Sequence, residues 1–283
     1  MDQKTIIGLE VSLSIPPHGC PNACWHCPQG LLVSRYPKDA PREFTLESLQ
    51  RCLETVPVSR HLAWTGFSEP FLCSDAVPIM LWAHQRGHTA MLSTTLRGIT
   101  HAGIEKIADL PWKCTVIHVP DAEGWMKIPV TDDYVNLFEH AVKAWKHHAD
   151  FVFGNYATPH PKLLPIMEAS GVPIPHFGLH DRCGMVEGLP HYRHTGRIHL
   201  CYKMFCGNLL PNGDLCLCCD DYGLQHVWGN LNRESYTDIY RGPKFRAFLD
   251  ALKDPESTVL CRTCMDGYKQ GFDPDHPPYL DQP

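Results

Sequence analysis

The sequence lacks the features that direct a protein to nucleic acid, to a membrane or out of the cell. The 283-residue chain has no run of lysine and arginine, and its formal net charge is −6 with histidine neutral. It therefore lacks the basic footprint of a nucleic-acid-binding protein. No uninterrupted apolar run approaches the roughly 20 residues of a membrane span, and Glu10 interrupts the short apolar stretch near the start, which is not a signal peptide. We expect a cytoplasmic protein without a nucleic-acid or membrane partner.

Histidine-based metal motifs are also missing. The chain has 18 histidines, but none stands in an H-x-E or H-E-x-x-H pattern, so most are expected to serve packing or the surface. Cysteine is the residue in excess, with 14 in all. Three lie between positions 20 and 27, five between 201 and 219, and two at 261 and 264. Clustered thiols without an export signal indicate metal or redox ligands rather than disulfide bonds.

Strand-like and helix-like stretches alternate up to residue 177. This alternation predicts an α/β fold built from βα units with a parallel sheet. About six units are too few for a closed eight-unit barrel, so we expect a partial (β/α)6 TIM-like barrel. The expected strands are 5–15, 61–65, 89–94, 114–119, 150–154 and 173–177, and the expected helices are one opening at Thr45 and those at 78–86, 100–108, 132–146 and 161–169.

The chain is expected to divide into four parts. Residues 1–178 would form the barrel and residues 179–200 a linker rich in Gly, His and Arg. Residues 201–264 would form a small cysteine-rich domain with a helix at 235–251. Residues 265–283 read as an extended tail.

The first cysteine group has the spacing C-x3-C-x2-C, formed by Cys20, Cys24 and Cys27. Three thiolates on one tight loop can bind one face of an iron–sulfur cubane and leave its fourth iron open. The alternative is a structural zinc site that takes His26 or His18 as its fourth ligand. The position of the loop, directly after the first strand, favours the cluster.

This loop resembles the signature of the radical S-adenosylmethionine (SAM) superfamily, with His26 in its aromatic slot. The segment after the second strand resembles the superfamily's GGEP motif, which contacts the amino group of SAM, although Phe67 and Ser68 replace two of its glycines. Small polar residues end the third strand, where the superfamily contacts the ribose. The resemblance implies that a [4Fe–4S] cluster and SAM generate a 5′-deoxyadenosyl radical. The expected SAM-binding residues are His26, Gly66, Phe67, Ser68, Glu69, Pro70, Ser93, Thr94, Thr95 and, at the end of the fifth strand, Asn155.

The second cysteine group resembles the SPASM/twitch extension of radical SAM enzymes. An early Cys is followed by G-x4-C, a Gly-Asn pair, a helix and C-x2-C. The implied ligands of an auxiliary [4Fe–4S] cluster are Cys201, Cys218, Cys261 and Cys264. Cys206 could replace Cys201, and Cys216 or Cys219 could replace Cys218. No cysteine follows Cys264, which favours the twitch form with a single auxiliary cluster; the alternative is a rubredoxin-like or zinc-ribbon site.

Three further residues are candidates for catalysis. Asp121 and Glu123 follow the fourth strand at the barrel mouth, where they could bind a substrate hydroxyl or amino group or accept a proton. For Asp121, a helix cap or loop charge is the competing interpretation. Cys183 lies in the linker, where a thiol could return a hydrogen atom to a substrate radical.

The resemblance implies an oxidoreductase acting on a small molecule. Twitch enzymes of this group oxidise or epimerise aminocyclitols and sugars, so the favoured hypothesis is oxidation of a carbinol carbon with the auxiliary cluster as electron acceptor. A flavodoxin or ferredoxin would supply the electron that starts the reaction. The alternatives are a radical epimerase with a cysteine hydrogen donor, a peptide-modifying maturase, and a non-catalytic iron–sulfur or zinc protein.

Overall fold

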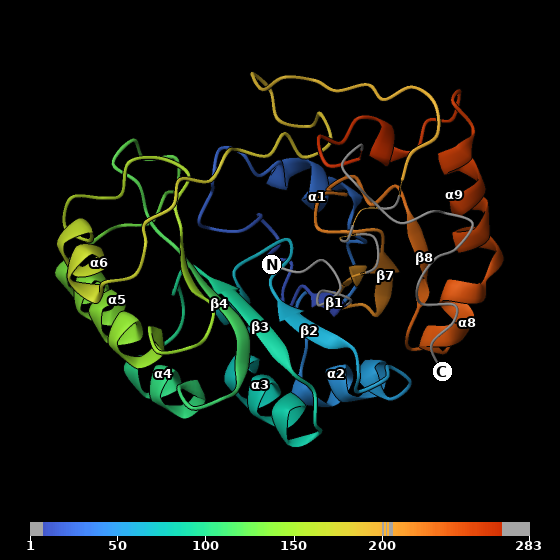
Figure 1. Ribbon diagram of the computed structural model, residues 1–283. Helices are drawn as coiled ribbons and strands as arrows, with labels where there is room; N and C mark the ends of the chain where they lie inside the picture. Colours follow the sequence, from blue (N-terminus) through green and yellow to red (C-terminus); the bar gives the residue numbers. More distant parts are fainter. Residues whose placement is uncertain (1–7, 200, 202, 204–205, 268–283) are drawn as a thin grey trace.

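The computed structural model describes residues 8–199, 201, 203 and 206–267. Within these residues one sheet runs in the order β5-β4-β3-β2-β1-β6-β7-β8. Its first five strands pair in parallel and form the inner wall of an open barrel (Figure 1). They are β1 Gly8–Val11, β2 His61–Trp64, β3 Ala90–Thr94, β4 Trp112–His118 and β5 Phe151–Gly154. The predicted strands are confirmed at these five places; residues 5–7 of the first lie outside the described residues.

Helices cover the outer face of this wall (Figure 1). Thr45, Thr100 and Thr131 each accept a backbone N–H three residues ahead and so begin α2, α4 and α5, as expected of N-cap threonines. The short α1, Gln29–Arg35, follows the first cysteine group and is absent from the sequence prediction. The other helices are α2 Leu46–Leu53, α3 Ala76–Gln85, α4 His101–Ile107, α5 Asp132–Trp145 and α6 Leu164–Ser170. None of the described helices combines the length and hydropathy needed to cross a membrane.

The two faces of β1 explain where the core and the site lie. Leu9, Val11 and, just beyond the strand, Leu13 are fully buried in the main hydrophobic core. The alternate residues Glu10 and Ser12 are buried polar groups. Because side chains alternate across a strand, this polar row faces the opposite side from the core, the side on which the site is built.

The sixth predicted strand is wrong. Residues 173–177 form no strand, because Pro173 and Pro175 have no N–H to donate to a neighbouring strand. The place beside β1 is taken instead by β6, Asn208–Leu209, which pairs with β1 in parallel. A strand from the C-terminal region therefore extends the barrel wall.

The C-terminal region adds a small antiparallel unit to that wall. β7, Asp214–Cys216, pairs with β6 and with β8, Val227–Asn230. The helix predicted at 235–251 is two helices, α8 Tyr236–Arg241 and α9 Pro243–Lys253. The break follows from Pro243, which pushes Gly242 out of the helical region to φ −72°, ψ 164°. Of the predicted tail 265–283, residues 268–283 lie outside the described residues.

Candidate active site

A cavity of about 440 Å³ opens at the carboxyl ends of the parallel strands. We call it the barrel pocket. It is lined by the first cysteine loop, by the ends of β2 and β3, and by the segment that follows residue 176. It brings together the first thiol group and every predicted SAM-binding residue except Asn155. These residues are Cys20, Cys24, His26, Cys27, Gly66, Phe67, Ser68, Glu69, Pro70, Ser93, Thr94 and Thr95.

The first cysteine loop directs its thiols into this pocket. The thiols of Cys24 and Cys27 are hydrogen-bonded to each other. That bond lowers the pKa of Cys27 against the opposing effect of burial, and the nearby charge of Arg182 acts in the same direction. The thiolate is the form that binds metal. Three thiols on one loop therefore fit a cluster with three protein ligands and one open iron.

Glu69 ties the second motif to the end of β3. One carboxylate oxygen accepts the Thr94 hydroxyl at 2.6 Å and the Phe71 N–H at 3.2 Å. The other accepts both the hydroxyl and the N–H of Thr95 at 2.6 Å. Burial raises the pKa of Glu69, while these four hydrogen bonds favour its charged form. The carboxylate is held in a single orientation beside the pocket.

The neighbouring residues of this motif have distinct roles. Gly66 has φ +104°, and a Cβ there would lie 2.1 Å from Ser12 Oγ, so only glycine fits. Phe67 takes the place of a glycine because its ring is buried against Tyr222, with centroids 4.9 Å apart. Ser68 Oγ donates to the Ser14 carbonyl at 2.5 Å. The substitutions in the motif therefore anchor the segment to β1 and to the C-terminal region.

Gln29 joins the two motifs and was missed by the sequence prediction. Its Oε1 accepts the Cys20 N–H at 3.0 Å, and its Nε2 donates to the Phe67 carbonyl at 2.7 Å. It begins α1, two residues after Cys27. A polar side chain directly after the cysteine group was the only available signal.

Asp121 supports the cysteine loop from outside the pocket lining. Its carboxylate accepts the N–H groups of Trp125 at 2.7 Å and Met126 at 3.0 Å. The loop that it holds then pairs with the cysteine loop, since Trp25 N–H donates to the Trp125 carbonyl at 3.0 Å and Lys127 N–H donates to Asn22 at 2.7 Å. Asp121 is therefore a buried carboxylate that organises a loop, rather than a helix cap or a solvated loop charge.

The other predicted residues of this region border a second, open groove. Glu123 and Asn155 line this groove rather than the barrel pocket. Glu123 accepts the Thr158 N–H, which lowers its pKa. Asn155 is buried, and its carbonyl accepts the Phe177 N–H at 2.7 Å. Neither side chain is placed to touch a molecule in the barrel pocket.

An aromatic wall in the pocket includes a histidine that the prediction did not select. The ring of His118, at the end of β4, stacks on Tyr156 with centroids 5.5 Å apart and an interplanar angle of 10°. Its Nε2 is 2.7 Å from Ser93 Oγ. Burial, with the charges of His26 and Arg182, lowers the pKa of His118 to about 4, so the ring is neutral near pH 7. Its place at a strand end was a usable signal.

Several polar atoms of the pocket are buried without a hydrogen-bond partner among the described residues. A buried polar group left unpaired costs about 1–3 kcal/mol. These unpaired atoms lie just beneath the pocket surface and make its lining polar, which fits SAM and a hydroxylated substrate. The atoms are Asn22 Oδ1, His26 Nδ1, His118 Nδ1 and Arg182 Nε.

A second cavity holds the C-terminal thiols. We call it the thiol cavity. All four predicted auxiliary ligands line it, and Cys183 lines it as a fifth thiol. The open alternatives lie elsewhere: Cys216 donates to the Asn208 carbonyl at 3.2 Å, and Cys219 lines the barrel pocket. The predicted ligands in the cavity are Cys201, Cys218, Cys261 and Cys264.

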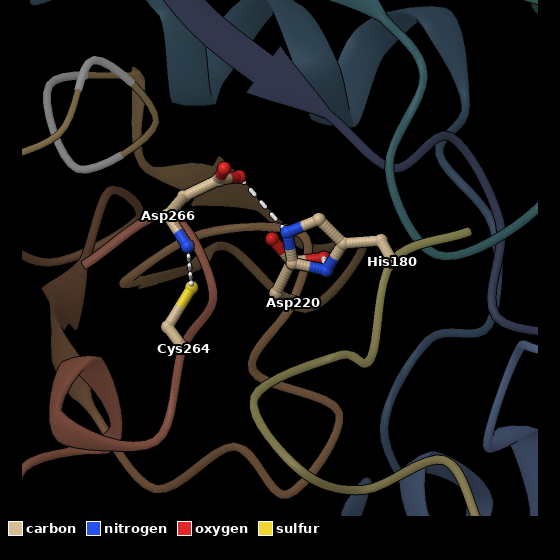
Figure 2. Close-up of side chains that lie close together, drawn as sticks. All are labelled: His180, Asp220, Cys264 and Asp266. Atoms are coloured by element: carbon tan, nitrogen blue, oxygen red, sulfur yellow. Dashed lines mark hydrogen bonds and ion pairs between the residues drawn. The ribbon is translucent and has the colours of Figure 1, made fainter. Parts of the chain in front are cut away.

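A charged network joins residues that line the barrel pocket to residues that line the thiol cavity, and Figure 2 shows four of its side chains. Asp266 donates its N–H to Cys264 Sγ at 3.4 Å, a contact suited to a thiolate ligand, and its carboxylate is 2.8 Å from His180 Nε2. The amine of Lys203 lies 2.8 Å from Asp220 and 3.0 Å from Asp266. His180, Asp220, Cys264 and Asp266 converge as metal ligands can, but the lysine already supplies the cation between the carboxylates.

Comparison with known proteins gives a domain and a fold. Residues 201–265 match the family model of SPASM, an iron–sulfur cluster-binding domain. A comparison with curated proteins found no match. The structure of BtrN in complex with AdoMet and 2-DOIA is 15% identical, with 95% of this chain and 97% of BtrN covered at a TM-score of 0.61. Streptococcus suis SuiB bound to precursor peptide SuiA is 11% identical, with 95% and 72% covered at 0.63.

A further solved structure, anSMEcpe with bound AdoMet, is 12% identical, with 93% and 91% of the chains covered at a TM-score of 0.52. These structures are radical SAM enzymes with SPASM or twitch domains. At identities this low, the likeness shows that this chain has the same fold. More particularly, it carries a SPASM domain at residues 201–265. The expected SAM and iron–sulfur cofactors agree with that domain and with AdoMet in the BtrN and anSMEcpe structures.

Proposed function

We propose that the chain is a radical SAM oxidoreductase that oxidises a carbinol carbon of a sugar or aminocyclitol. When bound, SAM and the first cluster supply a hydrogen-abstracting 5′-deoxyadenosyl radical, and the C-terminal cluster supplies a one-electron acceptor. The residues of the chain hold these groups, orient the substrate and take up its hydroxyl proton. A flavodoxin- or ferredoxin-type electron donor belongs to this proposal.

The observation that carries the proposal is the wall shared by the two cavities. Lys203 lines both the barrel pocket and the thiol cavity. The consecutive residues Arg182 and Cys183 line the pocket and the cavity, respectively. A substrate in the barrel pocket would lie between the two groups of thiols. It could then lose a hydrogen atom on the side of the first group and an electron on the side of the C-terminal group, as the proposed oxidation requires.

The polar lining of the pocket supports a hydroxylated substrate. His180, Lys203 and Asp266 present nitrogen and oxygen atoms along the wall nearest the thiol cavity. Such groups recognise hydroxyl and amino substituents by hydrogen bonds. BtrN, whose structure holds 2-DOIA, is matched over 97% of its length. SuiB, whose structure holds a precursor peptide, is matched over 72%, and anSMEcpe with a bound peptide over 91%, so a peptide substrate stays the alternative.

His118 is the residue that we assign to the hydroxyl group. Its ring lines the barrel pocket and is held by Ser93 and Tyr156. A Cβ at Gly154 would lie 2.6 Å from Nδ1, so a glycine is needed beside this ring. A neutral imidazole can accept a hydrogen bond from the hydroxyl and then its proton, which becomes far more acidic once the carbon carries an unpaired electron.

Epimerisation is the second candidate, because a thiol does line the barrel pocket. That thiol is Cys219, whereas Cys183, the predicted donor, lines the thiol cavity. Cys219 N–H donates to Glu10 at 3.1 Å. A hydrogen atom from Cys219 to the substrate carbon would leave a product isomeric with the substrate, and a one-electron donor would have to reduce the resulting sulfur radical.

The product mass separates these functions. The reconstituted protein would be incubated with SAM, dithionite and a panel of sugars and aminocyclitols in deuterated water. An oxidation product lighter by two hydrogens supports the proposal. An isomeric product carrying one deuterium, and lost in Cys219→Ala, supports epimerisation. Cleavage of SAM without conversion of any panel member directs the search to peptides, and no cleavage of SAM indicates a non-catalytic metal protein.

A further inference from the structure

The thiol cavity contains one more cysteine than an iron–sulfur cubane needs. Five cysteines line it, while a [4Fe–4S] cluster takes four thiolate ligands. Four of the five lie within the SPASM match at residues 201–265. The fifth, Cys183, precedes that match. The presence of Cys183 in the cavity therefore has no explanation in the domain alone.

The thiol of Cys183 makes the same kind of contact with a neighbouring cysteine as two thiols of the first group make with each other. It is hydrogen-bonded to the thiol of Cys264. Cys24 and Cys27, two thiols of one expected cluster, have the same relationship. Cys183 is also close enough to Cys218 for their charges to interact. By its contacts, Cys183 belongs to the ligand group.

The backbone around Cys183 is held in a disfavoured conformation. Arg182, Cys183 and Gly184 have φ of +48°, +57° and +81°, a region that non-glycine residues rarely adopt. Gly184 N–H donates to the carbonyl and carboxylate of Asp181, both at 3.1 Å. Such strain persists where the surroundings impose it, and it concentrates at functional sites. In this backbone conformation the Cys183 thiol is buried and contacts Cys264.

Cys183 and Cys201 are the two thiols of the cavity that belong neither to the hairpin nor to C-x2-C. Charge interactions link Cys201 to Cys218 and Cys261, and they link Cys183 to Cys264 and Cys218. The other three thiols come from the hairpin and from C-x2-C, both within the SPASM match. Either Cys183 or Cys201 can therefore complete a set of four with them.

We propose that Cys183 is an iron ligand of the C-terminal cluster, interchangeable with Cys201 as its fourth thiolate. In the exchange the bond from iron to the Cys201 sulfur breaks, and a bond to the Cys183 sulfur forms. The incoming thiol releases its proton and the outgoing thiolate takes one up, so no electron is transferred. The inference concerns cluster binding alone and does not depend on the proposed substrate.

The test measures iron in protein whose first site has been removed. In the reconstituted Cys20→Ala/Cys24→Ala/Cys27→Ala background, Cys201→Ser should keep about four irons per chain and the reduced-cluster EPR signal, with shifted g-values. Cys201→Ser/Cys183→Ser leaves three thiolates and an open iron, so its iron content should fall below that of Cys201→Ser and its reduced-cluster EPR signal should change again. Cys201→Ser/Cys206→Ser is the matched control, because Cys206 is a buried thiol that does not line the cavity, and it should retain the cluster.

Two results would overturn the proposal. One is loss of iron in Cys201→Ser as complete as in Cys218→Ser, which would show that Cys183 cannot replace Cys201. The other is an iron content and an EPR signal in Cys201→Ser/Cys183→Ser that equal those of Cys201→Ser, which would show that Cys183 does not bind iron. Cys201→Ser leaves the strained loop untouched, so its iron content is interpretable even if variants at residue 183 fold poorly, and circular dichroism of each variant identifies that case.

Discussion

The guanidinium of Arg182 donates to the carboxylate of Asp220 at 2.6 Å, and Asp220 is fully buried. One residue comes from the segment that follows the barrel and the other from the turn after Cys218 and Cys219. Although burial opposes the charged form, Lys203, Arg182 and His180 lower the pKa of Asp220. The pair therefore fixes the C-terminal thiols relative to the barrel pocket.

Breaking this pair should destabilise the protein. Removing one partner of a buried ion pair costs about 3–5 kcal/mol, and Lys203 still contacts Asp220, so we expect Arg182→Met to cost about 3 kcal/mol. The measurement is anaerobic thermal unfolding of the reconstituted protein. Because the two residues interact, Arg182→Met/Asp220→Asn should lose less stability than the sum of the single variants. Strict additivity would contradict a direct ion pair.

Asp121 should act on the first cluster rather than on the substrate. Asp121→Ala removes the acceptor for two backbone N–H groups and loosens the loop that pairs with the cysteine loop. We expect iron bound at the first site to fall by half or more, measured in a Cys218→Ser/Cys261→Ser/Cys264→Ser background. The iron content of Asp121→Asn, which keeps one acceptor oxygen, should lie between that of Asp121→Ala and that of the parent. Full iron with lost turnover would instead support the catalytic role expected from the sequence.

His118→Phe should separate SAM cleavage from substrate conversion. The phenyl ring preserves stacking on Tyr156 but removes both ring nitrogens. We expect kcat for substrate to fall roughly 10²-fold, the usual scale for losing an acid–base group, with unchanged formation of 5′-deoxyadenosine in the absence of substrate. Since the pKa of His118 is lowered to about 4 by burial, the parent should show no loss of activity from imidazole protonation between pH 6 and 8. An unchanged kcat in His118→Phe would remove the residue from the mechanism.

Glu10 should make stability depend on pH. Burial raises its pKa from 4.5 to about 7, so the folded state favours the protonated form. The stability that this form provides is complete below pH 4.5 and is lost as pH rises through 7, a loss of about 3 kcal/mol. Glu10→Gln keeps an acceptor for the Cys219 N–H without a charge. Its melting temperature should exceed that of the parent at pH 8.5 and approach it near pH 5.5; a constant difference would contradict the shift.

The sequence predicts local elements and motif residues better than it predicts contacts between distant segments. Thr45 as a helix start and the first thiol group depend on neighbours in sequence, and both are found as expected. The strand expected at 173–177 fails because its two prolines remove the N–H donors that pairing needs. The replacement strand comes from residues 208–209, whose pairing with β1 no local pattern encodes.

The same limit applies within the site. The four thiols that the SPASM/twitch resemblance implies as ligands line the thiol cavity, but Cys183 reaches it through the three-dimensional path of the linker. Asp121 and His118 lie only three residues apart, yet one organises a loop and the other lines the pocket. The position of a residue directly after a strand identifies the end of the barrel at which it lies. That position does not show whether its side chain points into the pocket.

We propose that this one chain combines a SAM-cleaving cluster with a second cluster in its SPASM domain. Anaerobic reconstitution, with iron and sulfide counted and 5′-deoxyadenosine assayed after SAM and dithionite are added, tests it directly. We expect about eight irons per chain and formation of 5′-deoxyadenosine, with about four irons and none of this product in Cys20→Ala/Cys24→Ala/Cys27→Ala. Zinc in place of iron, with SAM left intact, would contradict the account.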